Sequence, residues 1–449
     1  MTVLDVYLEA TPYPVGKLSA TDEGAMAFTY TTDQLPHPIS ASLPIVEEAY
    51  GDVAARGFFS NLLFENEMRD QVMQRHGISE GDIVGLLSHL GADCPGSISC
   101  VPEGAPPGKR PGNLNLDYDA LDGSPQLPED LSAATEQLPV IGSLAEIMTS
   151  LRDHRRVPKN TNDPSPLAGV QGKIALTRMA DGRLGLPKAN SGAPTTHILK
   201  VPRANAMSSV MREHLATRLM AGAQKHAVAE TRVLGEGDLQ GLLVTRFDRR
   251  LEEIHVHRIH QEDFCQALGF GHTLKYERNG SAGRAFTAAA IGKLLNGTRI
   301  PAQARQAFFE ITLANLVLGN SDNHAKNHAL LYTSTKPELA PAYDIDPVLL
   351  DNVTHEMSFC IGDARVADDV SQEDLNLFAR ALGARGFGTA QRQRATSIIQ
   401  SLHDAAGTLP RPIGKGLCDV IRQQSHHLSV NMGLGLEILE FDNVPVNRP

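Results

Sequence analysis

The sequence predicts an α+β fold with two lobes, one rich in β-sheet and one mainly helical, after an extra β/α subdomain at the N-terminus. Alternating apolar and polar residues, typical of half-buried strands, occur before about residue 45 and again between about 167 and 250. After about residue 260, apolar residues recur at helical spacing instead. A stretch rich in Pro, Gly and Asp, residues 100–130, separates the first strand-rich part from the second. We therefore expect three parts, which are residues 1–125, 126–258 and 259–449.

The first part is expected to begin with short strands and to continue with helices. The strand pattern occurs in "VYLEA", "GAMAFTYTT" and "SASLPI", which are separated by Gly, Pro and Asp. Helical patterns follow in "FFSNLLFENEMRDQVMQRHG" and "GDIVGLLSHLG". The Pro-, Gly- and Asp-rich stretch after them is expected to be irregular in its middle.

The second part predicts a small sheet with one inserted helix. Its strands are expected in "GKIALTRM", "THILKV", "ETRVL" and "LLVTRF", and its helix in "SSVMREHLATRLMAGA" after the second strand. "GEGDLQG", residues 235–241, is expected to be the turn between the last two strands. The third part is helical in "FFEITLANLVLG", "DLNLFARALGA" and "AQRQRATSIIQSLHDAAG", and no fixed-period repeat is present.

The composition of the 449 residues is that of a globular protein able to bury a core in each of two or three domains. The net charge of −11 argues against a chain that binds nucleic acid alone, because such affinity rests on clustered Lys and Arg. Any DNA contact is expected mainly through a partner. The five scattered cysteines contain no C-x-x-C pair, so neither a disulfide framework nor a zinc site is indicated. The histidines of "HVHRIH", His255, His257 and His260, could suggest a metal site, but two alternating histidines on a strand face are more often ordinary surface residues, and no metal role is expected there.

The chain shows no membrane or export signal. Asp5 and Glu9 lie where a signal peptide would have a basic start followed by an apolar core. No apolar run approaches the roughly 20 residues needed to span a bilayer. We therefore expect a cytoplasmic protein without a membrane partner.

A polar stretch, "GNSDNHAKNHALLY" at residues 319–332, places Asp322 and Asn327 five positions apart. Protein kinases use this spacing for the Asp that accepts the substrate's hydroxyl proton and for an Asn that binds metal. The spacing alone should occur about once by chance in a chain of this length. The alternative is therefore that these residues only solvate and cap a turn.

The residues that follow favour a metal site. "HALLY" predicts a strand, "TSTKPE" a turn, and "LAPAYDIDP" a return strand ending in Asp344 and Asp346. Such a hairpin would bring Asp344 back beside Asn327. Mg²⁺ prefers oxygen ligands and keeps several waters, so one carboxylate, one amide oxygen and nucleotide phosphates suffice. A sheet-rich half, a helical half and polar residues concentrated near their junction are the layout of a two-lobed kinase.

Two further stretches could contact phosphate. Lys200 ends the apolar strand "THILK", where an unpaired buried ammonium would be costly. It is either a phosphate-binding Lys with Glu213 on the next helix as its partner, or a Lys on an exposed edge strand. "AGVQGK", residues 168–173, offers Gly169 and Gly172 for close backbone approach to phosphate, with Lys173 adjacent. It is not a Walker sequence, and a plain turn is the alternative.

Taken together, the motifs resemble one known family. The chain resembles the HipA family of bacterial toxin Ser/Thr kinases in "PLAGVQGKIAL", "PTTHILKVP", "TRFDR", "HQEDFCQALG", "KYE", "GNSDNHAKN" and "PAYDI", in this order between residues 166 and 346. "VGKL", "SLPI" and "GADCPGSI" are similar to the N-terminal subdomain of that family. The resemblance implies a two-lobed protein-kinase-like fold, ATP and Mg²⁺ as cofactors, and a HipB-like antitoxin, a small helix-turn-helix repressor, as partner.

The resemblance also implies residue roles. Asp322 would be the catalytic residue, and Asn327 and Asp344 would bind the metal. Phe247 falls at the linker that contacts adenine, where the family often has a Glu two positions earlier and this chain has Thr245. The residues implied to contact the nucleotide are Gly169, Gly172, Lys173, Lys200, Phe247, Lys326 and Asn327.

A second departure concerns self-phosphorylation. The family's autophosphorylated Ser directly precedes the apolar residue of the loop before Gly169, but Pro166 stands there in this chain. Ser165, one position earlier, is the remaining candidate. Pro166 fixes its own φ and restricts the conformation of the residue before it.

The expected function is a HipA-like toxin Ser/Thr kinase that transfers the γ-phosphoryl of ATP to a bacterial protein. By resemblance, an aminoacyl-tRNA synthetase is the expected substrate, so that phosphorylation blocks translation and causes growth arrest and persistence. The chain would also act as co-repressor with the antitoxin. Two alternatives stay open, a small-molecule kinase of the aminoglycoside-phosphotransferase type and a catalytically silent co-repressor.

Overall fold

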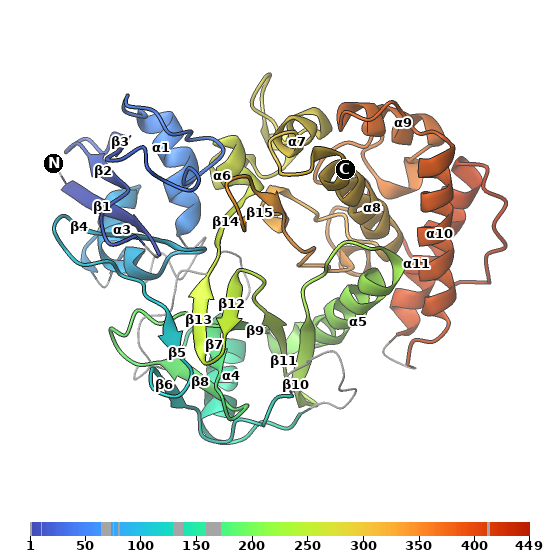
Figure 1. Cartoon of the computed structure of the whole chain (residues 1–449). Helices are drawn as coiled ribbons and strands as arrows, with labels where there is room; N and C mark the ends of the chain where they lie inside the picture. Colours follow the sequence, from blue (N-terminus) through green and yellow to red (C-terminus); the bar gives the residue numbers. More distant parts are fainter. Residues whose placement is uncertain are drawn as a thin grey trace. The chain divides into compact units, whose positions relative to one another are not determined.

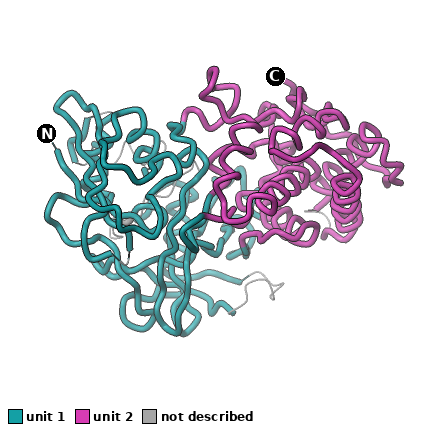
Figure 2. The backbone as a smooth tube through the Cα atoms, turned by 45° about the horizontal axis from the view of Figure 1, so that its top comes forward, with its two compact units in different colours: residues 1–210, 230–272, 330–336 teal, residues 211–229, 273–329, 337–449 magenta. Residues whose placement is uncertain are grey.

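The computed structural model describes residues 2–9, 11–63, 73–74, 76–79, 81–128, 138–158, 172–410 and 414–449. The chain forms two compact units, each built from separate segments (Figure 2). Unit 1 comprises Met1–Val210, Glu230–His272 and Leu330–Lys336, and unit 2 comprises Met211–Ala229, Thr273–Ala329 and Pro337–Pro449. The mixture of helices and antiparallel sheets confirms the predicted α+β class. The division of the chain at residues 125 and 258 stays a prediction.

Unit 1 begins with a four-stranded antiparallel sheet in the order β3-β2-β1-β4 (Figure 1). Its core is formed on one face, where Leu18 and Phe28 pack with residues of two helices. The alternation of buried and half-buried residues in the second and third strands produces this face. The elements are β1 (Thr2–Leu8), β2 (Gly16–Ala20), β3 (Met26–Tyr30), β4 (Ile98–Pro102), α1 (Asp52–Phe59) and α3 (Ile83–Leu90).

A second sheet of unit 1 has six antiparallel strands in the order β10-β11-β9-β7-β8-β6. The predicted sheet is therefore present, and β6, β8 and a helix, α4 (Gly142–His154), extend it beyond the prediction. That helix packs on β7, β9 and β11 through a buried apolar stripe. The strands are β6 (Tyr118–Ala120), β7 (Gly172–Arg178), β8 (Leu184–Pro187), β9 (His197–Val201), β10 (Thr231–Glu236) and β11 (Leu239–Thr245).

Short strands occupy the stretch of residues 100–130 that was expected to be irregular. β5 (Gly112–Asn113) pairs with β13 (His255–Arg258), which also pairs with β12 (Arg249–Glu252). β6 lies at the edge of the six-stranded sheet. Strands of two or three residues are too short to show an alternating pattern, which is why the sequence did not reveal them. The stretch therefore contributes edge strands to two sheets.

A buried ion pair connects β13 with the end of β1. The backbone N–H of Arg258 donates to Oε1 of Glu9 at 2.8 Å, and Nη1 of Arg258 donates to Oε2 at 2.8 Å. The two side chains are 0% and 3% exposed. Because both charges are out of water, loss of either partner would remove a buried ion pair and destabilise unit 1.

A second buried carboxylate, Glu262, lies on β14 (His260–Asp263) and connects three segments of unit 1. It accepts hydrogen bonds from Ser40 Oγ at 2.5 Å, from the backbone N–H of Ala41 at 2.8 Å and from Tyr332 Oη at 2.5 Å. Burial raises the pKa of Glu262 to about 7. Ser40 and Leu43 close a turn here, so the strand predicted in "SASLPI" is wrong. The polar groups of that turn are directed to the carboxylate instead of to a neighbouring strand.

Unit 2 is mainly helical, as predicted for the C-terminal part. α8 is its central helix and packs against α10 and α11, which also pack on each other. Its buried residues include an unbroken run from Ala307 to Leu318. Residues 432–449 form neither helix nor strand. The helices with most or all of their residues in unit 2 are α5 (Ser208–Ala223), α7 (Ala288–Leu295), α8 (Pro301–Leu318), α9 (Gln372–Ala381), α10 (Thr389–Ala406) and α11 (Lys415–Asn431). A short helix, α6 (Phe264–Leu268), belongs to unit 1.

Three of these helices match the sequence patterns closely. The predicted helix "SSVMREHLATRLMAGA" has the bounds of α5, and α9 and α10 cover most of their predicted stretches. Within the described residues, no helix combines the length and the apolar character needed to cross a membrane.

Candidate functional site

The predicted catalytic loop follows α8 in unit 2. Gly319 ends that helix with a left-handed φ of 75°, and its N–H donates to the carbonyl oxygens of Asn315 and Leu316. The polar residues of the loop are then folded inward, and Asn320, Ser321, Asn323 and Asn327 are at most 8% exposed. Asp322 is half-buried, so its carboxylate keeps contact with solvent in a loop whose other polar side chains are mostly buried.

Hydrogen bonds within this loop fix Asp322 and Asn327 relative to each other. The side-chain nitrogen of Asn327 donates to the backbone oxygen of Asp322 at 2.9 Å, and the N–H of His324 donates to the same oxygen at 2.9 Å. An amide that donates through its nitrogen directs its oxygen the other way, and oxygen is the ligand that Mg²⁺ prefers. The spacing of five residues is therefore the spacing of a closed turn, in which the amide oxygen of Asn327 points away from the Asp322 backbone oxygen.

The segment with Asp344 contacts the same loop. Tyr343 Oη donates to the backbone oxygen of Lys326 at 2.8 Å, and the amide nitrogen of Asn320 donates to the backbone oxygen of Asp344 at 3.3 Å. The buried imidazole of His324 lies in the field of both the Asp322 and the Asp344 carboxylates, although burial dominates and lowers its pKa. The structure thus brings Asp322, Asn327 and Asp344 together in unit 2.

The predicted return strand before Asp344 is largely wrong. The strand in this segment, β16, covers only Glu338–Leu339, whereas "HALLY" forms the predicted strand as β15 (Ala329–Tyr332). Asp344 has a left-handed φ of 61°, a conformation that does not continue a strand and that is uncommon outside Gly. A strained backbone at a charged residue is typical of a functional position.

Sequence reasoning assigned no individual role to two residues beside Asp322. Tyr276 Oη donates to Oδ1 of Asp322 at 2.7 Å, and its ring packs edge-on against His324. The guanidinium of Arg278 lies over the Tyr276 ring at 4.0 Å from its centroid. Tyr276 belongs to the "KYE" motif that contributed to the family resemblance, but no spacing rule connects it with Asp322 across 46 residues.

Unit 1 places the two predicted phosphate-binding lysines side by side. Lys173 on β7 and Lys200 on β9 are direct cross-strand partners, so their side chains leave the same face of the sheet. Both are partly exposed. The alternative that Lys200 lies on an edge strand is wrong, because β9 is flanked by β11 and β7. Like charges directly opposite one another are unfavourable, and a bound anion offsets that cost.

Of the other residues of unit 1 that were predicted to contact the nucleotide, the structure describes Gly172 and Phe247. Gly172 begins β7, where a Cβ would lie 2.9 Å from Nη1 of Arg155, the far end of a flexible side chain. Its contact with the nucleotide stays a prediction. Phe247 lies in the turn after β11, beside the buried ion pair of Arg246 and Asp248 at 2.9 Å. Ser165 and Gly169 lie outside the described residues.

Among the described residues, no metal site is formed by acidic residues, cysteines and histidines alone. Within the part of the chain that the structure describes, no group of three or more such residues is placed to hold an ion. This includes His255, His257 and His260, of which His255 is exposed, while His257 lies 3.4 Å from Glu252 and His260 is buried. One carboxylate and one amide oxygen, at Asp344 and Asn327, still fit Mg²⁺, because it is commonly bound by few protein ligands plus phosphates and water.

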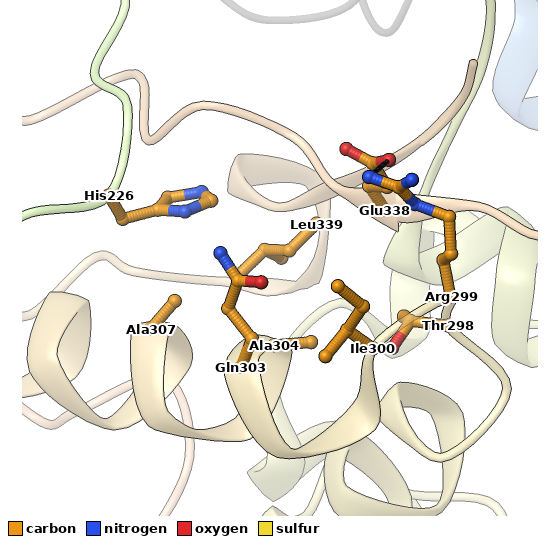
Figure 3. A pocket seen from close by; sticks show the side chains of 9 residues that line it. All are labelled: His226, Thr298, Arg299, Ile300, Gln303, Ala304, Ala307, Glu338 and Leu339. Atoms are coloured by element: carbon orange, nitrogen blue, oxygen red, sulfur yellow. Dashed lines mark ion pairs between the residues drawn. The ribbon is translucent and has the colours of Figure 1, made fainter.

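A small hollow in unit 2 is lined by other residues than those of the predicted site. It has a volume of about 90 Å³ and follows the start of α8, with His226 at one end and the ion pair of Arg299 and Glu338 at the other (Figure 3). Nε2 of His226 is directed to the backbone oxygen of Ala340 at 2.9 Å. None of the predicted site residues lines this hollow, and we assign it no role.

Models of two protein domains match the chain. The model described as HipA N-terminal domain matches residues 4–101, and the model described as HipA-like C-terminal domain matches residues 165–409. The chain belongs to the HipA family. The family resemblance predicted from the sequence motifs is thereby confirmed.

HipA relatives match over most of their length. "Putative kinase Y4mE" of Sinorhizobium fredii is 31% identical over 398 residues, which cover 87% of this chain and 88% of that protein. "Serine/threonine-protein kinase toxin HipA" of Shewanella oneidensis is 29% identical over 385 residues, 82% of this chain and 81% of that protein. The names of both relatives support a kinase.

A solved structure also matches this HipA-family chain. It is that of the Shewanella oneidensis toxin–antitoxin system of HipA, HipB and operator DNA, and the match has a TM-score of 0.74 at 26% identity. It covers 96% of this chain and 97% of the other. The predicted two-lobed, protein-kinase-like fold is therefore confirmed.

Proposed function

We propose that this chain is an ATP-dependent Ser/Thr protein kinase that transfers the γ-phosphoryl group of ATP to a hydroxyl of a bacterial protein. The observation that carries the proposal is the cluster of Asp322, Asn327 and Asp344 in one part of unit 2. Asp322 would orient the substrate hydroxyl and accept its proton. Asn327 and Asp344 would hold Mg²⁺, which supplies charge neutralisation at the phosphates when it is bound.

Most of the catalysis in such an enzyme comes from positioning and electrostatics, and this chain has the groups for both. Tyr276 holds Oδ1 of Asp322, so the carboxylate is oriented before a substrate arrives. Lys173 and Lys200 of unit 1 would bind nucleotide phosphates. The other predicted contacts of the nucleotide remain Gly169, Gly172, Phe247 and Lys326.

The proposed protein substrate is an aminoacyl-tRNA synthetase, whose phosphorylation would stop translation. The test is transfer from γ-labelled ATP and Mg²⁺ to a set of purified bacterial synthetases. We expect phosphoserine or phosphothreonine on one of them, identified by mass spectrometry. Labelling of a small hydroxyl compound instead, with no labelled protein, would favour an aminoglycoside-phosphotransferase-like activity.

The proposed partner is a HipB-like helix-turn-helix antitoxin, with DNA bound mainly through it. Two observations support this. The solved relative is a HipA, HipB and operator DNA complex, and the net charge of −11 on this chain disfavours direct DNA binding. In that setting the chain would act as a co-repressor in the cytoplasm. Ser165 remains the candidate for autophosphorylation.

A further prediction concerns the lysine pair of unit 1. Replacing Lys200 by Ala should raise the Kd for ATP, because one of the two cations that offset the phosphate charge is lost, while thermal stability without ligand stays nearly unchanged. Isothermal titration with ATP and Mg²⁺ measures the change. Lys188→Ala is the matched control, because Lys188 is exposed and its ammonium donates to the backbone oxygen of Leu116. Equal affinities for ATP in both variants and the wild type would mean that Lys200 does not bind the nucleotide phosphates.

A further inference from the structure

Asp346, two residues after Asp344, has a buried side chain oxygen that the protein itself does not satisfy. Its Oδ1 atom is out of contact with solvent and accepts no hydrogen bond from the described residues. Buried carboxylate oxygens are normally paired, because leaving one unpaired in the interior is costly. An Asp whose only role is to stabilise a turn typically accepts a hydrogen bond from a nearby backbone N–H through its side chain.

Most of the charged groups that interact with Asp346 are also acidic, so they add repulsion to the cost of its unpaired oxygen. The charged groups are the carboxylates of Glu213, Asp344 and Asp351 and the guanidinium of Arg212. Arg212 donates through Nη2 to Oδ1 of Asp351 at 2.8 Å, so this cation is already engaged by another carboxylate. Asp346 therefore lies among acidic groups, where a bound cation would stabilise its ionised carboxylate.

The position of Asp346 in the chain indicates which cation that is. Asp344 is the proposed Mg²⁺ ligand, and its left-handed backbone turns the chain between the two aspartates. Asn320 donates to the backbone oxygen of Asp344, which fixes this turn on the catalytic loop. Mg²⁺ and Mn²⁺ both accept carboxylate oxygens, and a nucleotide-bound Mg²⁺ commonly uses one or two carboxylates of the protein.

We propose that Asp346 is a second carboxylate ligand for the divalent cation held by Asp344. The inference rests on the proposed function, because Asp344 is a metal ligand only there. With two carboxylates, the chain can hold the cation before the nucleotide arrives. The buried oxygen of Asp346 is the group that would be satisfied by the ion.

The test is direct titration of the full-length protein with Mn²⁺, followed by electron paramagnetic resonance of the free ion. We expect Asp346→Asn and Asp344→Asn each to weaken Mn²⁺ binding on the order of tenfold or more. Asp351→Asn is the matched control, because it removes one negative charge from the same cluster without removing a proposed ligand. Its Mn²⁺ affinity should stay close to the wild-type value.

Thermal unfolding separates a lost ligand from a damaged fold. Without metal, Asp346→Asn should melt at or above the wild-type temperature, because a neutral amide is cheaper to bury among carboxylates. With saturating Mn²⁺, the upward shift of the wild type should be reduced in this variant.

The outcomes distinguish the inference from the proposed function. Wild-type Mn²⁺ affinity in Asp346→Asn, with weakened binding in Asp344→Asn, would overturn the role of Asp346 alone. Equal weakening in Asp346→Asn and Asp351→Asn would mean that only the negative field attracts the ion, and would also overturn it. Unchanged affinity in both Asp344→Asn and Asp346→Asn would remove the proposed metal site itself.

Discussion

Replacing Asp322 by Asn is expected to lower the rate of phosphoryl transfer by about 10²–10⁴-fold, the usual contribution of a positioned general base. The amide has nearly the shape of the carboxylate and can still accept the hydrogen bond of Tyr276, so the loop should keep its fold. It cannot accept the proton of a substrate hydroxyl. The Kd for ATP should therefore change little, and single-turnover transfer to a protein substrate is the measurement.

Asp363→Asn is the control for this substitution, because Asp363 is an exposed aspartate of the same unit. Its transfer rate should equal that of the wild type. A wild-type rate in Asp322→Asn would end the assignment of Asp322 as the catalytic residue. Loss of transfer with retained antitoxin binding would also separate kinase activity from a purely co-repressive role.

The second large effect is expected on stability, from Glu9→Ala in unit 1. Removing this carboxylate takes a buried anionic partner away from the guanidinium of Arg258, which still donates to the backbone oxygens of Arg110 and Gly192. Breaking a buried ion pair in this way typically costs about 3–5 kcal/mol. Urea denaturation followed by circular dichroism should show a lower midpoint by the corresponding amount.

Glu103→Ala provides the comparison for an exposed ion pair. Glu103 pairs with Lys17, and the two side chains are 57% and 44% exposed. Such pairs contribute about 0–1 kcal/mol, because water screens them. If Glu9→Ala and Glu103→Ala shifted the midpoint equally, water would have to reach Arg258 without cost, contrary to its full burial.

The sequence predicted those parts of the fold in which periodicity and length agree. α5 has the predicted bounds because its stretch is long, contains no Pro, and has its one Gly, Gly222, next to its C-terminal end. The turn in "GEGDLQG" was predicted correctly because Gly235 and Gly237 supply the positive φ values that it requires. β5, β6 and most of the segment before Asp344 could not be predicted, since very short strands and a left-handed Asp leave no periodic pattern.

The candidate site was only partly predictable for a related reason. Asp322 and Asn327 follow a spacing that reflects a local turn, and a local turn is encoded locally. Tyr276 and Asp346 depend on contacts that only the folded chain creates, because one is far away in sequence and the other is defined by its unpaired surroundings. Whether each predicted residue performs its role stays a prediction until the substitutions are made.

The segmented composition of unit 1 has a consequence for its synthesis on the ribosome. Its final residues, Leu330–Lys336, follow a long segment of unit 2 in the chain, yet Tyr332 is one of the three donors to Glu262. A nascent chain that ends before residue 330 therefore contains the turn at Ser40 and the carboxylate of Glu262 but not the tyrosine. Domains usually fold as units in the order of synthesis, N-terminal first. Here unit 1 cannot be completed before much of unit 2 has been translated. A transcript that ends before residue 330 therefore yields neither unit with all of its residues.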